Sequence, residues 1–349
     1  MNKLCRLFLL VLLSACAAYT YYDPGKAHHG REGFRNNYPH APIGQGFWKW
    51  QWERWRAHLP QAAPSGGWPI PVVKADLAYL RANRSEGTLT WIGHATLLLQ
   101  LNGINILTDP QFSARASPLS FVGPQRQVGL PLSIADLPHI DIVVISHNHY
   151  DHLDRNTVKQ LNTQPGGAPH FFVPLGLKAW LNGEGISNIS ELDWWDQQTE
   201  RGLIIHCVPV QHWSARGLAD RNKTLWGGWV IEARNFRFFF AGDTGYSQDF
   251  QDIGRRFGNF DLAAIPIGAY EPRWFMQTQH VNPEEAVRIH QDLHARYSVG
   301  IHWGTFVLTD EPLDEPPKKL QQALAAAGIA PERFFVLQHG ETRKLAILQ

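Results

Sequence analysis

One stretch of sequence decides the fold: Asp141-Ile142-Val143-Val144-Ile145-Ser146-His147-Asn148-His149-Tyr150-Asp151-His152. Its apolar residues 142–145 predict a strand that is covered on both faces, and ligand clusters in α/β proteins gather where such strands end. Four side chains that can each coordinate a metal follow within six positions. The chain has 17 histidines, and an isolated one would say little, but this spacing predicts a metal site.

The spacing within the cluster also indicates how many metals it serves. Alternate residues of an extended segment point the same way, so His147 and His149 should face one position. The adjacent Asp151 and His152 diverge toward neighbouring positions. This arrangement suits two metals better than one.

Three further candidate ligands follow apolar segments elsewhere in the chain. His212 comes after Cys207-Val208-Pro209-Val210-Gln211, Asp243 after Phe238-Phe239-Phe240-Ala241-Gly242, and His302 after Val299-Gly300-Ile301. A lone histidine at the end of a strand is usually structural. Together with the first cluster, however, these residues form a set that one rim of loops could collect.

Composition limits the classes of function. The chain has 349 residues, of which 44% are hydrophobic and 18% charged, so it can bury the core of one large domain or two modest ones. A net charge of +1 without a long basic block disfavours nucleic acid as a partner. Two of the three cysteines, Cys5, Cys16 and Cys207, lie in the first sixteen residues. A disulfide framework in the body is therefore excluded.

The first sixteen residues have the features of a targeting signal. Lys3 and Arg6 precede an apolar stretch over residues 7–13, which is too short to span a bilayer. The string Leu13-Ser14-Ala15-Cys16 resembles a bacterial lipobox, which implies a signal peptide over residues 1–15 and lipidation of Cys16; an ordinary secretory signal is the alternative. The lipobox would anchor the protein to a membrane outside the cytoplasm, facing the periplasm, with the outer membrane as one option.

Residues 16–71 are expected to form a linker and a tryptophan-rich extension. Trp48, Trp52, Trp55 and Leu59 recur at helical spacing. Such a helix so near a lipid anchor could lie at the bilayer interface, or its tryptophans could pack on the body of the protein. The sequence leaves both alternatives open.

Residues 72–349 are expected to form the catalytic domain. Strands over residues 88–101 and 104–108 should flank a hairpin turn at Asn102-Gly103. A capping sequence at Asn282-Pro283-Glu284-Glu285 predicts a helix over residues 286–295, and another helix is expected over 320–327. Two groups of strands with intervening helices favour a sandwich of sheets covered by helices. The other expected strands are 142–145, 171–174, 203–209, 229–233, 236–241, 262–267, 298–302 and 334–337.

The candidate ligands carry a family resemblance. The first cluster, His212, the string Ala241-Gly242-Asp243-Thr244-Gly245 and His302 resemble the ligand set of the metallo-β-lactamase superfamily, which implies a four-layer αββα sandwich. Four longer strings resemble one branch, the N-acyl-phosphatidylethanolamine-hydrolysing phospholipase D family, and this similarity runs from about residue 88 to 340. The strings are Trp91-Ile92-Gly93-His94-Ala95-Thr96, Leu192-Asp193-Trp194-Trp195, Pro266-Ile267-Gly268-Ala269-Tyr270-Glu271-Pro272-Arg273-Trp274-Phe275-Met276 and Ile301-His302-Trp303-Gly304-Thr305-Phe306.

The resemblance implies a role for each ligand. One zinc would be held by His147, His149 and His212, the other by Asp151, His152 and His302, and Asp243 would bridge them. Nitrogen and oxygen donors without a thiolate fit zinc but also admit iron or manganese. A hydroxide between the metals would attack phosphorus, with Asp151 orienting the water or accepting its proton. The products would be N-acylethanolamine and phosphatidic acid.

Other residues receive supporting roles from the same resemblance and from their positions. His280 should contact phosphate or protonate the leaving group, with a hydrogen bond to a ligand as the alternative. His94 is expected to support a ligand rather than to act in catalysis. The weaker candidates for substrate binding are Tyr150, Gln279 and Asp109.

Two other classes of function are compatible with the sequence. Fold and dinuclear site do not determine the substrate, so a lactonase or another esterase is an alternative. A lipoprotein that binds metal or lipid without turnover is less favoured, because structural metal sites are usually closed and mononuclear. The expected partners are membrane phospholipid as substrate and the membrane itself through the lipid anchor, and a homodimer is compatible with the sequence.

Overall fold

The strand predicted by the opening stretch is β4 (Ile142–Val144), an inner strand of the first of two seven-stranded sheets. The computed structural model describes residues 20–345, so the lipobox and Cys16 lie outside the described residues. The first sheet has the order β14-β1-β2-β3-β4-β5-β6, with β3 to β6 parallel. Its other strands are β1 (Thr88–Gly93), β2 (Thr96–Leu101), β3 (Ile104–Thr108), β5 (His170–Pro174), β6 (Ile189–Leu192) and β14 (Thr342–Lys344).

The second sheet has the order β13-β12-β11-β10-β9-β8-β7. Its strands β10 to β13 are parallel, whereas β7 to β10 form an antiparallel meander. The parallel half places the carboxyl ends of β10, β11 and β12 side by side. The strands are β7 (Gln197–Glu200), β8 (Leu203–Val208), β9 (Gly228–Ala233), β10 (Phe236–Phe240), β11 (Phe260–Pro266), β12 (Ala295–Ile301) and β13 (Phe334–Phe335).

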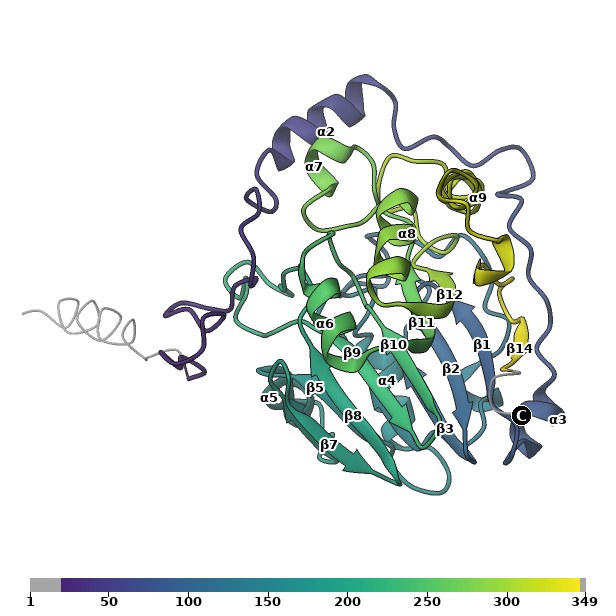
Figure 1. The fold of residues 1–349 in the computed structure, drawn as a ribbon. Coiled ribbons are helices and arrows are strands. Elements are labelled where there is room, and N and C mark those ends of the chain that lie inside the picture. The colour runs from purple at the N-terminus through teal and green to yellow at the C-terminus, as the bar shows by residue number, and fades with distance from the viewer. Residues whose placement is uncertain (1–19, 346–349) are drawn as a thin grey trace, which may run out of the picture.

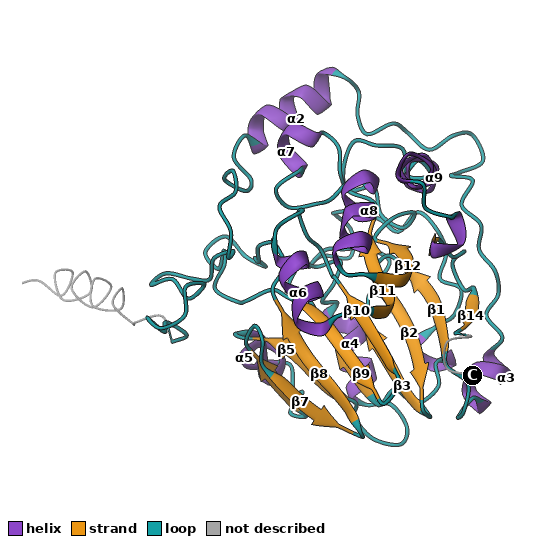
Figure 2. Ribbon diagram, viewed as in Figure 1, coloured by secondary structure: helices purple, strands orange, loops and turns teal. Residues whose placement is uncertain are grey.

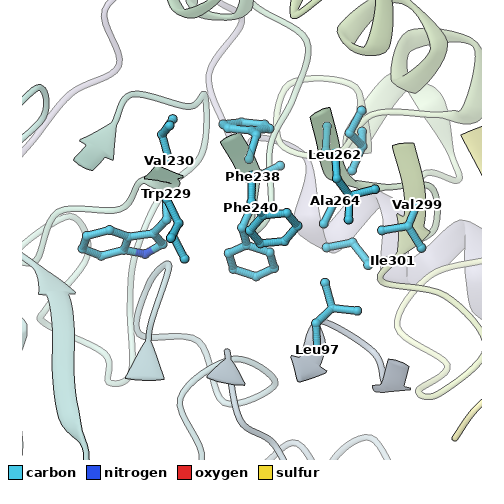
Figure 3. Packing of buried hydrophobic residues seen from close by; sticks show 14 of the residues in the cluster. Leu97, Trp229, Val230, Phe238, Phe240, Leu262, Ala264, Val299 and Ile301 are labelled. Atoms are coloured by element: carbon cyan, nitrogen blue, oxygen red, sulfur yellow. The ribbon is translucent and has the colours of Figure 1, made fainter. Parts of the chain in front are cut away.

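The two sheets stack with helices on both outer faces, which confirms the predicted αββα sandwich (Figures 1 and 2). Alternate residues of each strand face opposite sides. In the first sheet Leu97 points between the sheets, toward the strands that carry Phe240 and Ile301 (Figure 3), whereas Leu98 packs under the outer helices. The helices over the first sheet are α3 (Leu77–Ala82), α4 (Arg155–Asn162) and α5 (Leu177–Gly183); those over the second are α6 (Asp249–Phe257), α8 (Pro283–Asp292) and α9 (Pro316–Ala327).

Several expected boundaries are wrong, among them the start of the helix expected over residues 320–327, which begins at Pro316. Residues 88–101 form two antiparallel strands rather than one, because the chain turns at His94, whose φ of 53° is left-handed. The helix expected to reach Ala295 ends at Asp292, and Ala295 already begins β12. The tryptophan-rich helix, α2 (Phe47–Arg56), ends before Leu59.

The N-terminal extension packs on the catalytic body instead of leading away from it. At its start Lys26, His28 and His29 converge on the buried carboxylate of Asp193, at 2.5, 2.7 and 2.9 Å. Both oxygens of that carboxylate are thus occupied by partners from the extension. Each partner is a nitrogen that can donate a hydrogen bond to the carboxylate. We therefore infer that Asp193 fixes residues 26–29 on the surface of the catalytic body.

Helix α2 packs on the body of the protein through Trp50, which is not one of the tryptophans at the expected helical spacing. Trp50 is buried against Phe275 and Met276 of the short helix α7 (Arg273–Met276), which lies beside α2 in Figure 1. Trp48 and Trp55 instead remain 81% and 70% exposed. Across residues 20–345, no helix combines the length and the apolar character needed to cross a bilayer.

Candidate metal centre

The fold brings all seven predicted ligands together at one edge of the two sheets. The segment from His147 to His152 follows β4, His212 follows β8, Asp243 follows β10 and His302 follows β12. Because parallel strands end at the same edge of a sheet, loops distant in sequence meet there. The site is a direct consequence of the sheet order.

The seven side chains form two groups. His147, His149, His212 and Asp243 each offer a ligand atom, and these atoms all lie within 4.8 Å of one another. Within this group Nδ1 of His149 lies 2.8 Å from Nε2 of His147 and 3.4 Å from Nε2 of His212.

The second group holds the remaining predicted ligands and adds one histidine. Oδ2 of Asp151 lies 3.4 Å from Nε2 of both His152 and His302. It also lies 3.0 Å from Nε2 of His94, so the structure places His94 among the four ligand-type atoms of this group. The hydrogen bond from His94 to Asp151 fits the supporting role expected for His94.

Asp243 lies between the two groups. Its Oδ1 is 3.0 Å from Nε2 of His302, and its Oδ2 is 3.1 Å from Nε2 of His152. The same Oδ2 is 3.8 Å from Nε2 of His212 and 4.0 Å from that of His147. This is the position from which one carboxylate can serve two cations.

Three of the five predicted histidine ligands are oriented by hydrogen bonds at the outer ring nitrogen. Nδ1 of His147 bonds Ser146 Oγ at 2.9 Å, Nδ1 of His152 bonds Asp109 Oδ2 at 2.7 Å, and Nδ1 of His212 bonds the carbonyl of Gln279 at 3.0 Å. Metal-bound histidines typically use their second nitrogen in this way. The donor set therefore fits two divalent cations.

Charge gives a second reason for that fit. Burial would raise the pKa values of Asp243 and Asp151, but the neighbouring histidines His152 and His302 outweigh it and hold both pKa values well below the usual range. The two carboxylates in turn overcome the effect of burial on those histidines, raising the pKa of His152 well above its usual value and that of His302 to about 9. The buried negative charge that raises these two pKa values is also what would attract cations to the site.

The three histidines of the first group, His147, His149 and His212, are in the neutral form that can donate a lone pair to a metal. Burial lowers the pKa of His147 and His212 well below the usual value and that of His149 to about 4. Neutral imidazole is the form that binds a metal. This group therefore needs little deprotonation before it can accept one.

A glycine lets the Asp243 loop approach the His147 loop. Gly242 has φ of +61°, and a Cβ at this position would lie 2.4 Å from Cβ of Ser146. Both the left-handed backbone and the close contact require glycine. The geometry thus explains why glycine precedes Asp243 in the string Ala241-Gly242-Asp243.

A cavity of about 440 Å³ opens onto both groups. His149, Asp151 and Asp243 lie in its wall, so each ligand group is accessible from it. Most of the remaining lining is apolar. The other lining residues are Gly44, Phe47, Trp50, Ala116, Pro124, Tyr150, Trp213, Arg221, Phe275, Met276, Gln279, His280, Leu308 and Thr309.

The remaining sequence candidates lie at different depths. His280 lines the cavity, and its buried Nδ1 has no hydrogen-bond partner, so it is free to meet a ligand. Tyr150 also lines the cavity, although its hydroxyl donates to the carbonyl of Arg216 at 2.8 Å. Gln279 is 5% exposed there. Asp109 is fully buried behind His152 and outside the cavity, a position that suits orienting His152 rather than touching substrate.

Asn36 positions a candidate ligand, although nothing in the sequence predicted this role. Asn36, in the supposed linker, accepts a hydrogen bond from the backbone N–H of His212 at 3.0 Å and donates to its carbonyl at 2.9 Å. Its Oδ1 also accepts from the indole of Trp226 at 3.0 Å. An asparagine in a glycine- and proline-rich stretch gives no signal of such a contact.

Comparison with known proteins agrees with this geometry. Residues 104–303 match the model of the beta-lactamase superfamily domain. The chain is 46% identical over 258 residues to N-acyl-phosphatidylethanolamine-hydrolysing phospholipase D 1 of Caenorhabditis elegans, a match covering 71% of this chain and 72% of that protein.

The chain belongs to the N-acyl-phosphatidylethanolamine-hydrolysing phospholipase D-like family of metallo-β-lactamase-fold proteins. A second family member, the mitochondrial enzyme of that name in Saccharomyces cerevisiae, is 39% identical over 260 residues, covering 72% of this chain and 55% of the yeast protein. The fold of a metallo-hydrolase from Ignicoccus hospitalis superposes with a TM-score of 0.56 at 22% identity, covering 74% of this chain and 98% of that one. The chain is thus a hydrolase of the metallo-β-lactamase superfamily. Its two His/Asp groups fit the dinuclear metal site that this fold suggests.

Proposed function

We propose that this protein hydrolyses the phosphodiester of N-acyl-phosphatidylethanolamine, releasing N-acylethanolamine and phosphatidic acid. The observation that carries the proposal is the meeting of two ligand groups at Asp243, on the wall of a largely apolar cavity. A phosphodiester between acyl chains needs both features, because its charged centre and its apolar arms must be bound together. The relatives named for this reaction support the choice of substrate.

The lining residues have distinct roles in this proposal. Two divalent cations bound by the two groups would supply a water of lowered pKa and neutralise charge on the phosphate oxygens. Asp151, which lines the cavity, orients the water or accepts its proton. His280 hydrogen-bonds a phosphate oxygen or protonates the departing alkoxide. Hydrolysis forms one bond from water oxygen to phosphorus and breaks the bond from phosphorus to the ethanolamine oxygen.

Apolar and cationic residues complete the substrate site. Trp213, Phe275 and Met276 offer surface to acyl chains along the cavity. Arg221, held over the ring of Trp213 at 4.2 Å, is the positively charged side chain of the lining and offers charge to an anionic lipid. Together these residues favour a lipid over a small polar ester.

The substrate is tested by a panel. The purified chain is incubated with N-acyl-phosphatidylethanolamine, phosphatidylcholine and several lactones, and the products are resolved by mass spectrometry. We expect phosphatidic acid and N-acylethanolamine, with the activity lost in Asp243→Asn and kept in the control Asp261→Asn, whose carboxylate instead accepts from the backbone of Arg237. Lactone opening without lipid turnover would replace the proposal by the lactonase alternative.

The metal content follows from the ligand count. We propose zinc, with iron and manganese as the alternatives that nitrogen and oxygen donors admit. Elemental analysis of the purified chain should return about two metal ions per chain, and Asp243→Asn should return fewer. A wild-type chain that holds a single ion under saturating metal would refute the shared role of Asp243.

We also propose that Cys16 carries a lipid that holds the enzyme at a membrane outside the cytoplasm. The lipobox string supports this, and a tether would confine enzyme and lipid substrate to one surface. Cys16→Ser should shift the protein from the membrane fraction to the soluble fraction and remove the mass of the lipid. An unchanged mass would show that Cys16 is not lipidated.

A further inference from the structure

Exposed apolar side chains are concentrated on four short segments of the described chain. The described part of the chain exposes eleven large apolar side chains, and all but Tyr22 and Val72 belong to helices α2 and α7, to residues 117–123, or to the loop at Leu218. The nine side chains are Phe47, Trp48, Trp52, Trp55, Leu119, Phe121, Val122, Leu218 and Trp274.

These four segments border the cavity of the candidate metal centre, and α7 does so directly through Phe275 and Met276. Phe47 and Trp50 of α2 line the cavity, as do Ala116 and Pro124, which flank residues 117–123. The loop at Leu218 lies between Arg216, whose carbonyl accepts a hydrogen bond from the cavity residue Tyr150, and Arg221, which lines the cavity itself. The exposed apolar side chains therefore form a discontinuous rim, here called the aromatic rim, near the cavity.

Helix α2 holds its part of the rim rigidly. Trp50 stacks on Phe275 with ring centroids 4.8 Å apart, and its indole donates to Asp310 at 2.8 Å. Arg54 pairs with the same carboxylate at 2.8 Å. With this inward face fixed, the rings of Trp52 and Trp55, 5.1 Å apart, are presented to solvent as a preformed ridge.

The outward face of α2 has the composition of a membrane-interface helix. Tryptophan prefers the boundary between lipid headgroups and acyl chains, where its ring is apolar and its N–H is hydrated. Cations accompany these rings: Lys49 lies 4.4 Å above the ring of Trp274, and Arg56 is exposed at the end of the helix. Basic side chains at this depth meet lipid phosphates.

We propose that the aromatic rim is a docking surface for a phospholipid bilayer and brings the cavity mouth against the membrane. The inference rests on the proposed function, because a lipid substrate must pass from the bilayer into this cavity. A second copy of the chain is the other candidate occupant, but a copy seated on a rim around the cavity would obstruct the mouth. A bilayer instead presents substrate to it.

Depth-dependent quenching tests the docking directly. The full chain is mixed with vesicles of phosphatidylcholine brominated near the glycerol end of its acyl chains, a lipid that is not the proposed substrate. Residues 1–19 contain no tryptophan, so the N-terminal signal does not contribute. We expect quenching of wild-type fluorescence, with most of the quenched part lost when Trp48, Trp52 and Trp55 are all changed to Phe. The control Trp195→Phe, at a ring held by Arg256 rather than on the rim, should keep it.

Turnover provides a second, independent reading. In the combined variant Trp48→Ser, Phe121→Ser and Leu218→Ser, hydrolysis of bilayer substrate should fall at least about tenfold, because the rim no longer inserts. Turnover of a short-chain, monomeric diester should stay within about twofold, since none of these residues lines the cavity. The matched control Tyr22→Ser with Val72→Ser exchanges the two exposed apolar residues outside the rim, and it should behave as wild type on both substrates.

The outcomes separate docking from catalysis. Quenching with no hydrolysis of any lipid would overturn the proposed function and leave the docking surface standing. Absence of quenching in the wild type, or equal quenching in the triple Phe variant, would overturn the docking surface. A dimer in sedimentation velocity that the Ser variant dissociates, without quenching by lipid, would assign the rim to a second copy of the chain.

Discussion

Three ligand histidines are each held at the outer ring nitrogen by a different acceptor: a hydroxyl, a carboxylate and a backbone carbonyl. Asp109 makes the most hydrogen bonds of these three acceptors. Besides the bond with His152, its carboxylate accepts hydrogen bonds from the backbone N–H and the hydroxyl of Ser146. Ser146 in turn contacts His147. One buried carboxylate thus couples a histidine of each ligand group.

Replacing that carboxylate should weaken metal binding more than it weakens the fold. In Asp109→Asn we expect about 10-fold to 100-fold lower metal affinity, because the amide lacks the charge that makes His152 a better ligand. Competition with a chelator measures this. Asp261→Asn, remote from the ligands, serves as the control; equal affinities in the two variants would show that Asp109 only fills space.

At the residue scale, the sequence predicted the candidate ligands and, in His94, one residue that supports them, but it gave no signal for Asn36 and suggested substrate binding for Asp109. The seven ligands follow apolar strands in short recognisable strings, so their types and spacing are informative. Asn36 and Asp109 act through contacts with residues 176 and 43 positions away. Nothing local in the sequence marks a residue whose role is set by such distant packing.

At the element scale, the N-terminal extension is a structural part of the metal centre. Asn36 and Asn37 are neighbours of the same type, yet Asn36 holds the backbone of His212, whereas Asn37 donates to Asp249 at 2.8 Å. Asn36→Ala should lower kcat about 10-fold to 100-fold, since a displaced His212 misplaces the reacting groups. Asn37→Ala should cost about 1 kcal/mol of the free energy of unfolding and leave kcat unchanged. Steady-state kinetics with denaturant unfolding compares them, and equal kcat in both variants would contradict the role of Asn36.

Elements were predictable where a strand is buried on both faces. Strand β4 is apolar throughout, and β10 and β11 are apolar runs with one charged residue, Arg237 or Asp261, at the second position. Strand β7, with the sequence Gln197-Gln198-Thr199-Glu200, is a polar edge strand and has no such signal. The turn at His94 was missed because a histidine, not glycine, occupies the left-handed conformation there. Tertiary contacts therefore override local preference at these positions.

At the scale of the whole molecule, buried neutral histidines make stability depend on pH. Burial, aided by the charge of Arg333, lowers the pKa of His290 to about 4, and its ring bonds Ser298 at 2.8 Å. In the unfolded chain the pKa is about 6.5, so the unfolded state takes up the proton first. This stabilisation is complete above about pH 6.5 and is lost as the pH falls toward 4.

The variant His290→Gln should flatten that dependence. Between pH 7.5 and 4.5 the wild type should lose up to about 3 kcal/mol more free energy of unfolding than the variant does. Release of metal at low pH should change the free energy of unfolding equally in the wild type and in the variant. The difference between their pH dependences therefore reports on His290 alone. Denaturant unfolding at several pH values measures this difference. Equal pH dependence of the free energy of unfolding in the two proteins would show that folding does not lower the pKa of His290.

The central claim, attack of water on phosphorus in a membrane phospholipid, is tested most directly by isotope labelling. N-acyl-phosphatidylethanolamine is hydrolysed by the purified chain in water enriched in oxygen-18, and both products are weighed by mass spectrometry. We predict one heavy oxygen in phosphatidic acid and none in N-acylethanolamine. Heavy oxygen in N-acylethanolamine would place the attack on carbon, and label in a released fatty acid would mark an esterase; either result would contradict the account.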